Sequence, residues 1–187
     1  MDNPFFNLIK PYLTIIDNGQ LFRQPFKWLY YLIGGLNILL PLYLLYQIIH
    51  LELFSYAEGM GIVALILGWL VIAVGGWVGF QLWWNRAVNV SEISETSSDF
   101  VAIPVFAHFI QTLGEWLGTS IAVFGTLVTL IIMLFMGDSL SSVPLVGKFG
   151  IFSIVFSIIY GFLILVISRV IAEQILALAA IANNTKK

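Results

Sequence analysis

GMGIVALILGWLVIAVGGWVGFQLWW, residues 59–84, decides the fold because it contains no charged side chain. A helix needs roughly 20 predominantly apolar residues to cross the hydrocarbon of a bilayer, and this stretch exceeds that length before Arg86 follows it. Three further stretches have the same character, at residues 28–49, 116–137 and 149–168. The sequence therefore predicts an all-α integral membrane protein, a four-helix bundle built from two hairpins.

The composition of the whole chain agrees with a lipid environment. Hydrophobic residues make up 60% of the 187 residues and charged residues 10%, and the mean hydropathy is +0.99. A soluble domain carries about 25% charged residues. The net charge of −2 favours no nucleic-acid partner. The absence of cysteine excludes disulfides, thiolate metal sites and cysteine nucleophiles.

Basic residues are distributed unequally between the two sides of the predicted bundle. The side that holds both termini and the connection between the hairpins has Lys10, Arg23, Lys27, Arg86, Arg169, Lys186 and Lys187, whereas the opposite side has Lys148. Basic flanks mark the cytoplasmic side of membrane proteins. Both termini are therefore expected in the cytoplasm, and the bilayer is expected to be the plasma or inner membrane.

The order of these segments predicts four parts of the chain. They are a cytoplasmic interfacial segment at 1–27, a first transmembrane hairpin at 28–86, a polar cytoplasmic loop at 87–100, and an interfacial helix, a second transmembrane hairpin and a cytoplasmic tail at 101–187. An interfacial helix is expected over residues 4–16, where apolar residues recur at helical spacing. Because Arg86 and Arg169 each close a hairpin, an internal repeat is a further interpretation.

A polar stripe precedes the third span. His108, Gln111, Thr112 and Glu115 share one side of a helix, and the side chains between them are mostly apolar. Either this stripe lies in the headgroup layer with Trp116 as an anchor, or it faces the bundle and lines an ion path. A full uncharged span begins at Trp116, so we favour the first interpretation.

Charged residues are expected together at the inner boundary of the membrane. Glu115 is predicted to pair with Arg86 or Arg169, and Arg169 can pair with Glu173 four residues later. The alternative is that each charged side chain extends to the interface alone. The candidate residues for a polar layer or a pore are His108, Gln111, Glu115, Arg86, Arg169 and Glu173.

Small residues recur every three, four or seven positions in three of the predicted spans. Membrane helices associate where small side chains let their backbones approach. These stripes are expected to pack the helices of one chain together, or else to join copies of it. The candidate packing residues are Gly61, Gly68, Gly75, Gly79, Gly118, Ala122, Gly125, Ser157 and Gly161.

No catalytic or metal site is predicted. The chain has two histidines, His50 and His108, which are expected at different levels, and no phosphate loop, HExxH or GxSxG motif occurs. We therefore expect no enzyme, metal or cofactor. A lipid-modifying enzyme is the least favoured interpretation.

The end of the chain, ISRVIAEQILALAAIANNTKK at 167–187, resembles the closing segment of a family of short bacterial two-helix membrane hairpins of unknown function. The likeness rests on Arg169, Glu173 and the run from Ile181 to Thr185, and Asn183 departs from the acidic residue of that pattern. The resemblance implies a membrane hairpin module and no catalytic activity.

These observations favour a multi-pass accessory or scaffolding subunit. Its expected partners are the lipid bilayer and either further copies of the chain or a larger membrane-protein complex. The alternative function is a small oligomeric channel or transporter with a polar path near Glu115 and Arg169.

Overall fold

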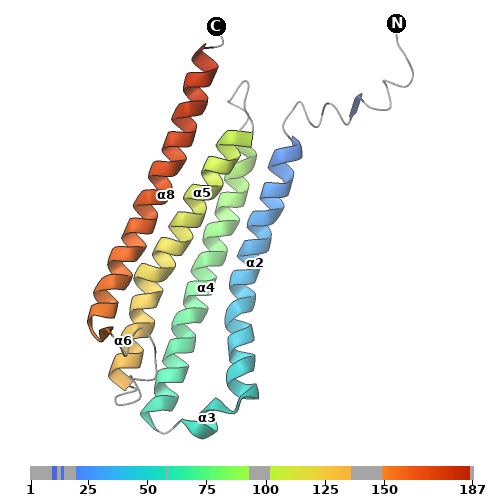
Figure 1. Ribbon diagram of the computed structural model, residues 1–187. Coiled ribbons are helices and arrows are strands. Elements are labelled where there is room, and N and C mark those ends of the chain that lie inside the picture. The colour runs from blue at the N-terminus through green and yellow to red at the C-terminus, as the bar shows by residue number, and fades with distance from the viewer. Residues whose placement is uncertain are drawn as a thin grey trace, which may run out of the picture.

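The structure is a computed structural model that describes residues 10, 11, 14, 20–57, 59–92, 102–135 and 149–185. Its elements are all helical, which confirms the predicted all-α class (Figure 1). Within these residues, four helical rods are long and apolar enough to cross a membrane. In chain order the elements are α2 (Gln20–His50), α3 (Leu53–Tyr56), α4 (Met60–Glu92), α5 (Ala102–Thr119), η1 (Ser120–Gly125), α6 (Thr126–Phe135) and α8 (Phe152–Thr185).

The helices are longer than the spans expected from the sequence. α2 has 31 residues, α4 has 33 and α8 has 34. At 1.5 Å per residue these lengths are roughly 46–51 Å, against about 30 Å of hydrocarbon. α4 continues to Glu92, so the loop predicted from residue 87 was wrong in its first six residues. α8 begins at Phe152 rather than at Phe149, after Gly150 with a φ of 54°.

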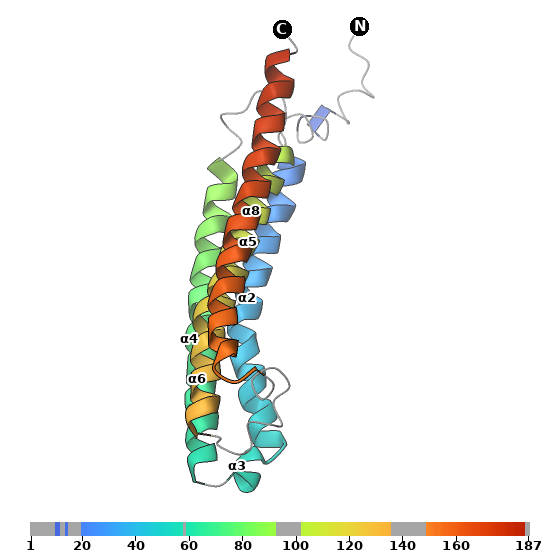
Figure 2. The same cartoon turned by 60° about the vertical axis from the view of Figure 1, so that its left-hand side comes forward.

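The rods run side by side and alternate in direction, as Figures 1 and 2 show. α2 packs along α4, and α5 packs along α8. The rod made of α5, η1 and α6 joins the two pairs through its contacts with α4. α8 contacts this rod and lies at the edge of the bundle away from α2 (Figure 1).

The third rod is one continuous helical run from Ala102 to Phe135. α5 leads directly into η1, a six-residue π-helix, and then into α6. A π turn shifts the faces of a helix by an inserted residue. Within it Ala122 lies against Gly161 of α8, and Phe124 lies against Gly75 of α4. The helix expected over residues 4–16 lies outside the described residues, except at 10, 11 and 14.

Close helix contacts occur where a side chain would not fit. A Cβ atom on Gly118 would lie 2.6 Å from the carbonyl oxygen of Gly161, so α5 and α8 meet backbone to backbone. Between α2 and α4, a Cβ on Gly76 would collide with the carbonyl of Asn37. That carbonyl has no helical donor because Pro41, four residues later, lacks an N–H group.

The small residues predicted to pack helices divide into three groups. Gly75, Gly79, Gly118, Ala122 and Gly161 lie at contacts between helices, as expected. A Cβ atom on Gly125 would lie 4.0 Å from the hydroxyl oxygen of Ser157, which is the outer limit of contact. Gly61 and Gly68 meet no other long helix of this chain, because a Cβ on Gly61 would touch only Ala57 and a Cβ on Gly68 would touch nothing within 4 Å. Gly68 instead lines an apolar cavity of about 230 Å³ between α2, α4 and α6.

Candidate functional site

A buried cluster lies where α2 begins, α4 ends and α5 begins. Tyr30, Trp83, Ala87, Val90 and Val105 are completely buried there. The Trp83 ring lies 5.1 Å from the Tyr30 ring, 6.0 Å from Phe109 and 6.1 Å from Trp116, measured between centroids. Three helices thus share one aromatic core, and the polar contacts described next surround it.

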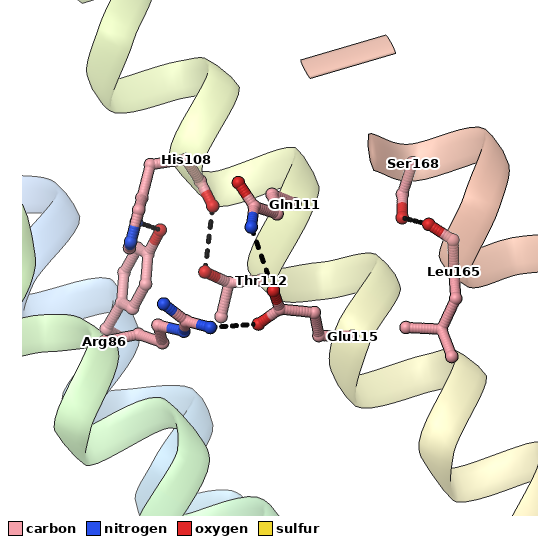
Figure 3. A network of polar contacts seen from close by, with 8 residues as sticks. Arg86, His108, Gln111, Thr112, Glu115, Leu165 and Ser168 are labelled. Carbon is pink, nitrogen blue, oxygen red and sulfur yellow. Dashed lines mark hydrogen bonds and ion pairs between the residues drawn. The ribbon is translucent and has the colours of Figure 1, made fainter. Parts of the chain in front are cut away.

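An ion pair joins the two hairpins beside this core. Nη2 of Arg86 on α4 donates a hydrogen bond of 2.7 Å to Oε2 of Glu115 on α5 (Figure 3). Nε2 of Gln111 donates to the other oxygen of the carboxylate, at 3.0 Å. The side chains of Arg86 and Glu115 are 34% and 22% exposed. Both carboxylate oxygens therefore have a partner from the protein.

A second polar contact joins α2 to α5. The hydroxyl of Tyr30 and Nδ1 of His108 are 2.8 Å apart and share a hydrogen bond, with their rings stacked at 5.8 Å. The hydroxyl of Thr112 donates to the carbonyl of His108 at 2.8 Å (Figure 3). Thr112 is only 1% exposed. His108 thus serves as an interhelical hydrogen-bond partner within the bundle.

A third contact, made by Trp116, lies one helical turn after Thr112 on α5. Nε1 of Trp116 donates to Oδ1 of Asn37 at 2.8 Å, and the Asn37 amide donates to the carbonyl of Ile33 at 2.8 Å. Gly79 of α4 faces both side chains, and a Cβ there would collide with Asn37. The glycine therefore makes room for a hydrogen bond between α2 and α5.

The favoured interpretation of the polar stripe was wrong about the direction in which the stripe faces. His108, Thr112 and Glu115 face α2 and α4 rather than the headgroups. The reason is that α5 is covered on two sides: Val105 and Thr112 are buried on one, and Ala107, Gly114 and Gly118 are buried as well. The sequence shows the amphipathic pattern but not that neighbouring helices, instead of water, occupy the polar side.

The predicted pairs of charged residues are present. Glu115 pairs with Arg86, one of its two expected partners, and Arg169 pairs with Glu173 at 3.1 Å. The second pair is exposed, at 66% and 67% of the side chains, and does not include Glu115. Gly114 of α5 lies against Ser168 of α8, because a Cβ on Gly114 would collide with the serine side chain. Glu115 and Arg169, the next residue on each helix, therefore lie at the same level along the bundle. We name this level of the bundle, marked by Arg86, Glu115 and Arg169, the polar layer.

Sequence reasoning did not include Tyr30, Trp83 or Asn37 among the site residues. Asn37 carries a usable signal, since it is a polar residue within a span and four positions before Pro41. Tyr30 and Trp83 stand beside a second residue of the same type, Tyr31 and Trp84, and the sequence does not tell which member is buried. The structure buries the first of each pair completely.

The arrangement is suited to holding helices together. Arg86 and Gln111 both bond to Glu115, and Tyr30 bonds to His108. Among the described residues, no group of three His, Asp or Glu side chains is placed to hold a metal ion. The three described cavities are lined almost entirely by apolar side chains.

Comparison with known proteins adds no assignment: no family model, no curated protein and no solved structure matches this chain. The resemblance of residues 167–187 to the small membrane hairpins stays a prediction.

Proposed function

We propose that this protein is a non-enzymatic subunit of a larger membrane-protein complex. The observation that carries the proposal is an apolar surface on α5 and α8 that lies beyond the polar layer. We name this surface the overhang and define it as residues 102–114 and 169–185.

The polar layer fits one boundary of the hydrocarbon. Glu115 is 20 residues from Phe135, the last residue of α6, and Tyr30 is 20 residues from His50, the last residue of α2. Both separations correspond to roughly 30 Å, which is the thickness of the hydrocarbon. With the far ends of these helices at one boundary, Arg86 and Glu115 reach the other. The overhang then extends roughly 20–25 Å outside the hydrocarbon.

The overhang contains an apolar groove. A cavity of about 470 Å³ lies between Ala102, Ile103 and Phe106 of α5 and Ile175, Leu178, Ala179 and Ala182 of α8. Phe106 is 48% exposed and Leu178 is 67% exposed. Large exposed apolar surfaces outside the membrane are characteristic of protein–protein contacts. A helix of another subunit, including one from a second copy of this chain, has the shape and chemistry to fill the groove.

The paired polar layer supports the same proposal. It connects α2, α4 and α5 by contacts that hold the rods at fixed positions, and α8 is attached to α5 through small residues. A fixed bundle that presents a groove is suited to a scaffold. The excess of basic residues at the end that carries the overhang supports a cytoplasmic position for it, in the plasma or inner membrane.

A matched pair of substitutions tests the proposal. Leu178 lines the groove and Leu176 on the same helix does not, although it is 43% exposed. After crosslinking in native membranes and extraction in mild detergent, the wild-type chain should migrate in a reproducible assembly larger than the monomer. Leu178→Gln should lose that assembly and Leu176→Gln should keep it. A monomeric wild-type chain, or equal behaviour of the two variants, would contradict the proposal.

The second candidate function is a small oligomeric channel or transporter. It is favoured by the partial exposure of Arg86 and Glu115, which leaves the ion pair reachable from outside the bundle. The apolar lining of the described cavities gives it less support. Ion flux through liposomes that contain the purified protein separates the two functions. Flux that Glu115→Gln abolishes would favour the channel, and the absence of flux in any gradient would count against it.

A further inference from the structure

A continuous series of aromatic rings follows the outer face of α2 and α4. The Tyr31 ring lies 4.5 Å from Trp84, Trp84 lies 5.3 Å from Phe80, and Phe80 lies 5.7 Å from Trp77, measured between centroids. Trp84 is 49% exposed and Trp77 is 53% exposed, so the series faces the surroundings of the bundle. We name these four residues the aromatic ladder.

A positive charge lies at one end of the aromatic ladder. Nζ of Lys27 is 6.0 Å from the centroid of the Tyr31 ring. Trp28, next in the chain, is 69% exposed and lies 6.3 Å from Tyr31. Lys27 precedes the buried Tyr30 by three residues, which is less than one helical turn. The charge is therefore close to the level of the polar layer, while the ladder continues toward the middle of the bundle.

No described carboxylate neutralises Lys27. Among the acidic side chains that the structure describes, Glu115 is bonded to Arg86 and Glu173 to Arg169. Glu52 follows the opposite end of α2. Lys27 thus differs from Arg86 and Arg169, each of which has an acidic partner. A cation at the membrane boundary, beside exposed Trp and Tyr rings, complements an anionic headgroup.

We propose that this face binds an anionic phospholipid from the bilayer. The phosphate-bearing headgroup contacts the Lys27 ammonium group, and an acyl chain lies along the aromatic ladder. Charge complementarity selects the headgroup, and the exposed rings supply apolar contact for the chain. The site is on a different pair of helices from the overhang, so it needs no partner subunit, and it rests only on the placement of the polar layer at the membrane boundary.

Quenching of tryptophan fluorescence by brominated lipids tests this site. The protein is reconstituted in phosphatidylcholine bilayers that contain increasing fractions of dibrominated phosphatidylglycerol or dibrominated phosphatidylcholine. The wild type should prefer the anionic lipid about fivefold, the value that corresponds to about 1 kcal/mol for one basic residue near anionic lipid. Lys27→Gln should bring the preference close to one, and Lys27→Arg should retain most of it. Trp84→Phe should reduce the quenching itself.

Arg169→Gln is the matched control, because it removes one positive charge from the exposed pair on α8. It should leave the preference unchanged, and circular dichroism should show that each variant is folded. An unchanged preference in folded Lys27→Gln, or an equal loss in Arg169→Gln, would overturn the proposal. Excess inorganic phosphate at matched ionic strength should not remove the preference. Its removal would indicate a site for free phosphate instead of a lipid.

Discussion

The guanidinium of Arg86 on α4 and the carboxylate of Glu115 on α5 are 2.7 Å apart and join the first hairpin to the second. Each side chain keeps part of its exposure, so the pair is intermediate between a surface ion pair and a fully buried one. A surface pair contributes about 0–1 kcal/mol, and breaking a buried one costs about 3–5 kcal/mol. The removal of either partner should cost an amount between these limits.

We therefore expect Glu115→Ala and Arg86→Ala each to destabilise the fold by about 1–3 kcal/mol. A double-mutant cycle should give a coupling energy of about 1–2 kcal/mol. The measurement is the free energy of unfolding in mixed micelles. The exposed pair of Arg169 and Glu173 is the control, and its coupling should be about 0.3–0.5 kcal/mol. Equal coupling energies for the two pairs would show that the interhelical position of the first adds nothing.

The contact between α5 and α8 predicts a specific effect of methyl groups. Gly118→Ala should destabilise the fold by about 1–3 kcal/mol, because its Cβ would lie 2.6 Å from the carbonyl oxygen of Gly161 and backbone cannot move aside easily. Gly68→Ala should be neutral or slightly stabilising, since no atom lies within 4 Å of its Cβ position. The melting temperatures of the two variants check this, and a larger loss in Gly68→Ala would contradict the described packing.

The hydrogen bond between Asn37 and Trp116 should contribute a modest coupling. Interhelical hydrogen bonds in membranes average about 0.6 kcal/mol in double-mutant cycles. A cycle of Asn37→Ala and Trp116→Phe should give about that coupling in the free energy of unfolding. The control cycle uses Gln47→Ala in place of Asn37→Ala, because Gln47 bonds to Tyr43 on its own helix. Zero coupling between Asn37 and Trp116 would mean that the contact does not hold α2 against α5.

The class of fold and the approximate positions of the spans were predictable because they depend only on the length of each stretch without charged residues. The pairs Arg86–Glu115 and Arg169–Glu173 were predictable from the level of the charges and from their spacing. The helix ends were less predictable. α4 continues through Ala87 and Val90, two residues that are buried against α2 and α5 and so favour helix where the polar sequence suggested a loop.

The orientation of the stripe from His108 to Glu115 could not be predicted, because one helix pattern does not tell which neighbours cover it. The same limit applies to two of the candidate packing residues, which meet no other long helix of this chain. Gly61 and Gly68 continue the stripe of small residues, but a cavity lies beside Gly68, and Gly61 meets only the nearby Ala57. Conversely, Gly76 was not among the candidates, although a Cβ there would collide with the carbonyl of Asn37 on α2. Pro41 leaves that carbonyl without a helical donor. This contact involves two helices, so the sequence of one helix does not show it.

The depth of the overhang is the central claim, and spin labels on α8 measure it most directly. The chain has no cysteine, so single cysteines at Tyr160 and Ile181 can be labelled without other changes. These positions are 59% and 60% exposed, and 21 residues separate them, or roughly 31 Å. The label at Tyr160 should be relaxed mainly by oxygen, and the label at Ile181 mainly by a water-soluble nickel complex. A label at Ile181 that is as accessible to oxygen, and as protected from nickel, as the label at Tyr160 would place the overhang inside the bilayer and contradict this account.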